Sequence, residues 1–255
     1  MKHIQLLTTI FLLVFLAGCQ SSEESKKEAM DIEKRASFHY RLGIDALHKG
    51  LLPKAFEELL LSEQISPNQP ETLDAIAYAW RVRGDNKQAE KYYESAIESN
   101  ASSATRNNYG SLLIEMGEYE RAITQLKIAL EDPRYRNQAL AFTNLGDAQT
   151  GLKKYDDAIK SYRKAHMLAQ DWTHPQLREA QTYIQLERPN YAQALYETIL
   201  RKEPANQQAL IGLMQVTEKT GEQKIVRQYL QNFIEKTPDE LQKAWAKDEL
   251  AHLKK

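Results

Sequence analysis

The residues whose types could support chemistry are one cysteine, six histidines and 35 carboxylates in a chain of 255 residues. No two histidines have the His-x-x-x-His spacing that places two metal ligands on one face of a helix. The histidines are His3, His39, His48, His166, His174 and His252. The sequence contains no Gly-x-Ser-x-Gly elbow, no Gly-x-Gly-x-x-Gly loop and no Gly-Lys-Ser/Thr phosphate cradle. We therefore predict that the chain is not an enzyme and holds no metal and no cofactor.

The single cysteine, Cys19, stands where a different chemistry is expected. Lys2 and His3 precede an apolar run over residues 4–16, which is shorter than the roughly 18 residues needed to span a bilayer and indicates an export signal. The run ends in Leu-Ala-Gly-Cys, which resembles the lipobox of bacterial lipoproteins. We expect removal of the signal peptide 1–18 and lipidation of Cys19, whose acyl chains anchor the protein to a membrane. The alternative is an ordinary signal peptide with an incidental cysteine.

Composition limits the partners and the means of holding the fold together. Lys and Arg total 34 against 35 Asp and Glu, a net charge of -1, whereas nucleic-acid binding requires a basic surface. A lone cysteine allows no internal disulfide, so packing must hold the fold, and 42% hydrophobic residues suffice for that. The polar, charged segment 19–32 predicts a flexible tether. We expect neither a nucleic acid nor a small-molecule substrate as partner.

The rest of the chain is organised by a repeat of about 34 residues. Alanines recur at intervals of 34, 33, 36 and 34 residues, and each precedes a bulky apolar residue by four positions. The pairs are Ala55 and Leu59, Ala89 and Tyr93, Ala122 and Leu126, Ala158 and Tyr162, and Ala192 and Tyr196. Small residues recur upstream, at Gly43, Ala77, Gly110, Gly146 and Ala180. A small residue lets two helices cross closely and a large one fills the space beside it, so the pattern predicts tetratricopeptide helix pairs.

The predicted fold is all-α: a tetratricopeptide-repeat right-handed α-solenoid over residues 33–255. About six helix-pair repeats are expected, at 36–69, 70–102, 103–138, 139–172, 173–206 and 207–240. Between the two helices of four pairs stand glycines suited to positive φ, namely Gly50, Gly84, Gly117 and Gly221. A C-terminal capping helix over 241–253 should cover the last apolar face with Leu241, Ala244, Trp245, Leu250 and Leu253.

The groove of such a solenoid is lined by the first helix of each pair, through residues offset from the small crossing residue. In the first three repeats these are Tyr40, Ile44, Leu47, Tyr78, Arg81, Asn107, Ser111 and Ile114. Their aromatic and aliphatic share exceeds what a solvated face needs, so we expect a protein partner to bind here. The alternatives are that some of these side chains pack against neighbouring helices, or that the convex face binds instead.

Several segments give the chain a more specific resemblance. They are Arg-Asn-Asn-Tyr-Gly at 106–110, Gly-Glu-Tyr-Glu-Arg-Ala at 117–122, and, after a long connection through Pro133 and Tyr135, Asn-Leu-Gly at 144–146 and Lys-Lys-Tyr-Asp-Asp-Ala at 153–158. With the lipobox and the repeats, they resemble the type IV pilus biogenesis and stability lipoproteins, the pilotins. The resemblance implies an outer-membrane lipoprotein, facing the periplasm, that binds the type IV pilus secretin and promotes its localisation and multimer assembly. Gln20 after the lipidated cysteine agrees with that location.

A sibling interaction protein is the remaining alternative. A tetratricopeptide lipoprotein of the β-barrel assembly machinery, or a periplasmic adaptor for hydrolases or proteases, would share every feature except the Asn-Asn-Tyr-Gly segment. An enzyme would require a convergent polar cluster that the spacing of residues does not indicate.

Overall fold

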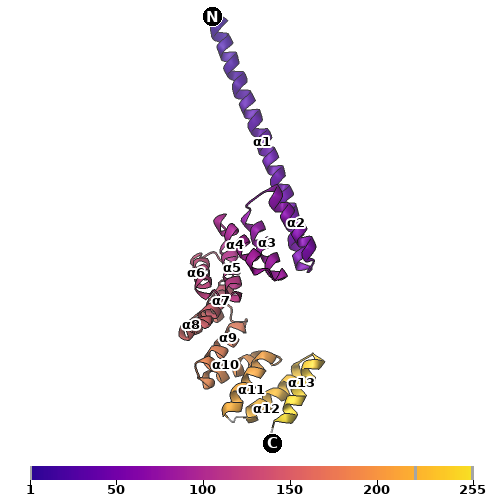
Figure 1. The fold of residues 1–255 in the computed structure, drawn as a ribbon, viewed down its shortest axis with the longest axis vertical. Helices are drawn as coiled ribbons and strands as arrows, with labels where there is room; N and C mark the ends of the chain where they lie inside the picture. The colour runs from indigo at the N-terminus through magenta and orange to yellow at the C-terminus, as the bar shows by residue number, and fades with distance from the viewer. Residues whose placement is uncertain (1, 221–222, 254–255) are drawn as a thin grey trace. The chain divides into compact units, whose positions relative to one another are not determined.

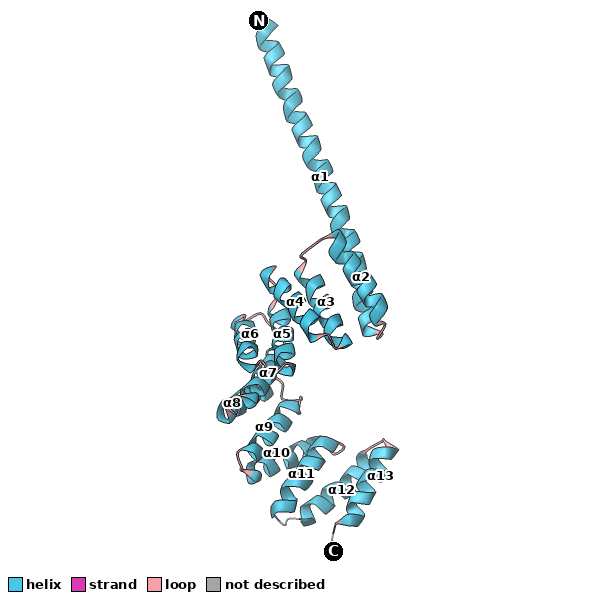
Figure 2. Cartoon of the chain, viewed as in Figure 1, coloured by secondary structure: helices cyan, strands magenta, loops and turns pink. Residues whose placement is uncertain are grey.

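The computed structural model describes residues 2–220 and 223–253, and every regular element in that part of the chain is a helix (Figure 2). The thirteen helices described there follow one another in sequential pairs with a last single helix (Figure 1), which confirms the predicted tetratricopeptide solenoid. The helices are α1 Lys2–His48, α2 Leu52–Ile65, α3 Pro70–Arg83, α4 Asn86–Glu98, α5 Ser103–Glu115, α6 Tyr119–Glu131, α7 Gln138–Gly151, α8 Tyr155–Leu168, α9 His174–Gln185, α10 Pro189–Lys202, α11 Gln207–Thr220, α12 Gln223–Lys236 and α13 Glu240–His252.

The chain divides into two compact units, Met1–Thr105 and Arg106–Lys255. In the first unit, α2 packs against α1 and α3, and a buried cluster forms from Leu59, Ala75, Ile76 and Ala79. In the second unit, a continuous core extends from Ile159 in α8 to Ala246 in α13. Each helix of this core packs against the next along the chain, so apolar burial accumulates from neighbour to neighbour, as in other repeat folds.

The repeated small and large residues form the crossings within the pairs. All five repeated alanines are fully buried, and the bulky residue that follows each is at most 2% exposed. A Cβ built on Gly43 would lie 2.5 Å from Leu59 Cγ, and one on Gly146 would lie 2.5 Å from Tyr162 Cε1. These separations are shorter than any real contact of this kind, so the helices can cross here only because the residue is glycine.

The turns inside the pairs use positive φ. Gly50, Gly84 and Gly117 have φ values of 70°, 88° and 79°, as the sequence predicted, whereas Gly221 lies outside the described residues. In the fourth and fifth pairs the same backbone conformation falls on Lys153 and Glu187, with φ values of 58° and 55°. The geometry of the pair therefore imposes the left-handed conformation there on residues that tolerate it poorly.

Helix α1 differs from the expectation for its N-terminal part. It is continuous through residues 19–32, for which the sequence predicts a flexible tether, and residues 25–35 are exposed (Figure 1). Glu, Lys, Ala and Met are strong helix formers, and Lys34 lies 3.9 Å from Asp31 one turn away. Local helix propensity therefore accounts for the helical backbone in this polar segment.

The helices of residues 2–220 and 223–253 differ in length and in apolar character. None of the helices described there combines the length and the apolar character required to cross a bilayer.

Helix α13 covers the end of the second unit, although not with every predicted residue. Trp245 packs edge-on against Phe233, with ring centroids 5.8 Å apart, and Leu250 also packs against the core. Leu241, however, is 84% exposed and contributes nothing to the cap, and Ala244 is also exposed. The Asp239 carboxylate accepts hydrogen bonds from the first backbone amides of the helix, so Leu241 lies in the first turn, on the outward face.

Candidate interaction surfaces

Three predicted groove residues lie together on α1 in the first unit. Tyr40, Ile44 and Leu47 follow one another at helical spacing, are each half-buried, and pack against the cluster around Leu59. The buried part of each side chain is fixed by the core, while the rest stays open. Side chains held in this way lose little conformational freedom when a partner binds.

Two further predicted residues lie on α3, which contacts α1. Tyr78 is 45% exposed, whereas Arg81 is half-buried. Burial raises the pKa of Tyr40, and the Asp74 carboxylate raises it further. We call Tyr40, Ile44, Leu47, Tyr78 and Arg81 the α1–α3 surface.

Aromatic packing behind the α1–α3 surface was not foreseen from the sequence. Phe56 of α2 and Trp80 of α3 meet edge-on with ring centroids 4.7 Å apart, and both pack against the Leu59 cluster. The Arg83 guanidinium lies over the Trp80 ring, 5.0 Å from its centroid. These contacts fix α3 against α2 and so hold Tyr78 in place. Because α2 contributes no groove residue, the repeat register gave no reason to single out Phe56.

The remaining predicted residues lie in the second unit, on α5, and they differ in exposure. Asn107 is only 3% exposed, and its side-chain oxygen accepts a hydrogen bond of 2.9 Å from Asn144 of α7. Packing between helices, the alternative raised for such residues, therefore describes Asn107. Ser111 and Ile114 are half-buried and retain open surface.

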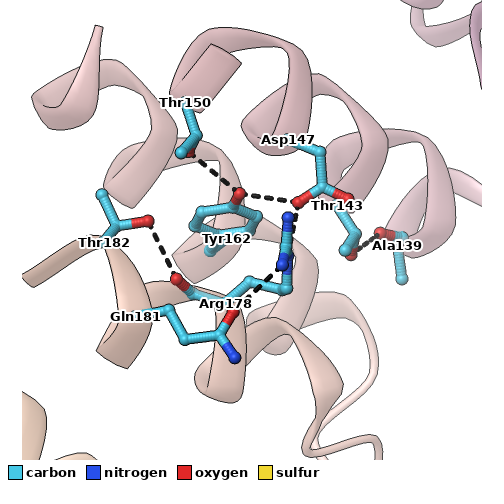
Figure 3. A network of polar contacts seen from close by, with 8 residues as sticks. All are labelled: Ala139, Thr143, Asp147, Thr150, Tyr162, Arg178, Gln181 and Thr182. Carbon is cyan, nitrogen blue, oxygen red and sulfur yellow. Dashed lines mark hydrogen bonds and ion pairs between the residues drawn. The ribbon is translucent and has the colours of Figure 1, made fainter. Parts of the chain in front are cut away.

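A polar network on α7, α8 and α9 forms a second region of interest (Figure 3). Asp147 accepts hydrogen bonds of 2.7 Å from both the Tyr162 phenol and the Arg178 guanidinium. Arg178 also donates to Gln181 at 3.0 Å, and Thr150 lies 3.1 Å from the Tyr162 hydroxyl. The network links the fourth repeat to the fifth.

The charges in this network largely compensate one another. Burial raises the pKa of Tyr162, and the neighbouring Asp147 carboxylate raises it further, so the phenol stays protonated and can donate. Burial lowers the pKa of His174, which lies near the same pair. Asp147 follows Gly146 as Ile44 follows Gly43, so extending the groove register to the fourth repeat would have identified it.

The chemistry available in both regions is non-covalent. Across residues 2–220 and 223–253, no group of three or more His, Cys, Asp or Glu side chains is arranged to hold a metal ion. The α1–α3 surface offers apolar and aromatic contact, while the Asp147 network offers hydrogen bonds. Both suit protein recognition.

Comparison with known proteins agrees with the fold. A family model described as tetratricopeptide repeat matches residues 108–175. An uncharacterized protein of Haemophilus influenzae is 28% identical over 153 residues, covering 60% of this chain and 83% of its own. Tetratricopeptide proteins of this kind are generally non-catalytic scaffolds.

Two solved structures resemble the chain over most of its length. Pseudomonas aeruginosa PilF matches with a TM-score of 0.70 at 21% identity, covering 86% of this chain and 99% of PilF. PilW, described as a widely conserved type IV pilus biogenesis factor, matches with a TM-score of 0.73 at 15% identity, covering 82% of this chain and 98% of PilW. At these identities the likeness shows a shared fold.

Proposed function

We propose that this chain is a non-catalytic outer-membrane lipoprotein that binds the type IV pilus secretin and promotes its localisation and multimer assembly. Its lipid is attached to Cys19, and its solenoid faces the periplasm. The partner contacts the α1–α3 surface of the first unit, and we propose Ser111 and Ile114 of the second unit as a contact of their own.

The observation that carries this proposal is the composition and support of the α1–α3 surface. Tyr40 and Tyr78 present aromatic rings from adjacent first helices, and Ile44 and Leu47 add aliphatic contact. Interface hot spots are enriched in tyrosine and arginine, and they are strongest where packing already fixes the side chain.

The likeness to PilF and PilW supports the choice of partner. Both matches cover nearly the whole length of the solved chains, and PilW is described as a type IV pilus biogenesis factor. The sequence resemblance to pilotins, made on the segments at 106–110 and 153–158, leads independently to the same system. No described feature favours an adaptor of the β-barrel assembly machinery or of a hydrolase.

Helix α1 is suited to connect the anchor with the binding surface. Cys19 and Tyr40 lie on the same continuous helix. At 1.5 Å per residue, this stretch spans about 30 Å. A lipid on Cys19 would therefore hold the α1–α3 surface within reach of a secretin that is inserting into the same membrane.

The proposal is tested by deleting the gene for this protein in its native strain. Deletion should reduce the amount of assembled secretin multimer in the outer-membrane fraction, measured by immunoblot of unheated samples, and re-expression of the wild-type chain should restore it. Unchanged multimer in the outer membrane of the deletion strain would contradict the proposal.

A further inference from the structure

Three adjoining cavities run along the second unit, on a surface that the proposed function does not use. The first, of about 290 Å³, is lined by α7, α8 and α9 and shares Gln181 and Gln185 with the second, of about 340 Å³. The second shares Ile211 and Gln215 with the third, of about 600 Å³, which extends to α13. Neighbouring cavities share lining residues, and we call the three together a groove.

The middle of this groove is lined by glutamine amides. Gln181 and Gln185 of α9, and Gln208 and Gln215 of α11, are all exposed there, and no charged side chain lines this middle cavity. We call this feature the amide groove. Each amide offers two donors and one acceptor, which match the alternating N–H and C=O groups of an extended polypeptide backbone in either chain direction.

Most of these amides are available for a ligand. Gln181 accepts from Arg178 at 3.0 Å, which leaves its amide nitrogen free to donate outward. In the described part of the chain, no protein group is hydrogen-bonded to the side chains of Gln185, Gln208 or Gln215. An uncharged lining also offers a charged ligand side chain no opposite charge to offset the hydration that it would lose.

The bottom of the groove is apolar and depends on a glycine. Gly212 faces the Tyr196 ring so closely that any Cβ would overlap it. Ile184 and Ile211 line the same cavity. Burial raises the pKa of Tyr196 to about 12, so its phenol stays neutral at physiological pH. Small apolar ligand side chains therefore fit between the amides.

The two ends of the groove differ in charge. Lys153 and Arg178 line the end at α7, where Asp147 offsets only the Arg178 charge. Glu218 and Glu249 line the other end, beside α13. A ligand lying along the groove therefore meets positive charge at one end and negative charge at the other.

We propose that the amide groove binds an extended polypeptide segment with an uncharged middle, an acidic residue at the Lys153 end and a basic residue at the Glu218 end. This site is separate from the α1–α3 surface and would give the chain a second protein partner or a second segment of the same one. The proposal does not depend on the identity of the first partner.

A peptide selection on the full chain tests this proposal. A random library of displayed peptides of about ten residues, which span roughly 33 Å when extended, is selected on the purified wild-type chain. The enriched peptides are then synthesised with a fluorescent label, and their affinities are measured by anisotropy. They should carry charges of opposite sign at their two ends and an uncharged middle.

Variants identify the site. The double variant Gln208→Glu and Gln215→Glu should lower the affinity for these peptides by about tenfold or more, because the variant loses amide donors and gains negative charge. The matched pair Gln228→Glu and Gln231→Glu adds the same charge at exposed positions of α12 outside the groove and should leave affinity unchanged. Circular dichroism verifies that all variants are folded.

The outcomes separate this proposal from the proposed function. Peptides selected here should bind the Tyr40→Ala and Tyr78→Ala variant as tightly as the wild type. Failure to enrich any peptide, equal binding to the Gln208→Glu and Gln215→Glu variant, or enriched peptides with charges in the middle would each overturn the proposal. None of these results depends on whether the chain binds secretin.

Discussion

Gly110 of α5 faces Leu126 of α6 so closely that a Cβ on Gly110 would lie 2.7 Å from Leu126 Cγ. Leu126 is fully buried and cannot move aside without disturbing its neighbours. We therefore expect Gly110→Leu to overpack the third repeat and lower the free energy of unfolding by about 1–3 kcal/mol or more. Urea denaturation measures this change. Ala104→Leu, at an exposed position of the same helix, is the control, and equal midpoints for the two variants would show that the crossing is misplaced.

The left-handed residues Lys153 and Glu187 suggest a route to greater stability. Each occupies a turn position that the earlier repeats fill with glycine, at φ values of 58° and 55°. Lys153→Gly and Glu187→Gly should each raise the free energy of unfolding by about 1 kcal/mol, since relief of the left-handed strain outweighs the added freedom of the unfolded chain.

Thermal and urea unfolding check this prediction against a glycine placed in a helix. Lys164→Gly, at an exposed position within α8, should destabilise the protein by about 1 kcal/mol. If the two turn variants lose stability as Lys164→Gly does, strain at those turns is not significant.

An ion cluster at the first helix pair should make stability depend on pH. The Glu58 carboxylate lies 2.6 Å from His39 Nδ1 and 2.6 Å from Lys54 Nζ, and the hydrogen bond to His39, followed by that to Lys54, lowers the pKa of Glu58. A lowered folded-state pKa adds stability above the unfolded value of about 4.3, and this stability is lost as pH falls through the folded pKa.

Glu58→Gln should therefore flatten the acid side of the stability profile, measured as urea midpoints from neutral to acidic pH. The variant should be less stable than the wild type at neutral pH, and the two should converge in acid. Glu57→Gln, an exposed neighbour that also pairs with Lys54, is the control. Parallel profiles for the wild type and Glu58→Gln would refute a role for the cluster.

Anchoring through Cys19 is tested by fractionation. Cys19→Ser removes the thiol that accepts the lipid, so the protein should leave the outer-membrane fraction and retain its signal peptide, as judged by immunoblot and mass. The measurement is repeated in a strain that lacks secretin, because a bound partner could hold the variant at the membrane. An outer-membrane Cys19→Ser protein in that strain would disprove lipid anchoring.

The fold was largely predictable because its repeated contacts use residues of distinctive size. Ala89 and Tyr93, for example, are both fully buried, as their phase in the repeat predicted. The turn conformation was predictable at Gly84 but not at Lys153 or Glu187, since their residue types carry no preference for positive φ. There the geometry of the helix pair overrides local preference.

The candidate surfaces were predictable only in part. The register located Tyr40 and Tyr78 on the first helices of their pairs, where they retain open surface. The register could not predict that the Asn107 side chain is buried, because its burial depends on Asn144, which lies 37 residues away along the chain. The role of Gly212 was hidden for a similar reason: its constraint comes from Tyr196 of the preceding repeat.

The central claim is that the α1–α3 surface binds the secretin. The most direct measurement is the affinity of purified secretin for the wild-type chain, for the Tyr40→Ala and Tyr78→Ala pair, and for an outer-helix pair, Lys87→Ala and Lys91→Ala. Truncating the two tyrosines should weaken binding by at least about 2 kcal/mol, or roughly thirtyfold, with folding and lipidation intact. The lysine pair, exposed on α4, should change binding by less than about 1 kcal/mol per residue. A tyrosine variant that binds as tightly as the wild type while the lysine variant fails would contradict the account.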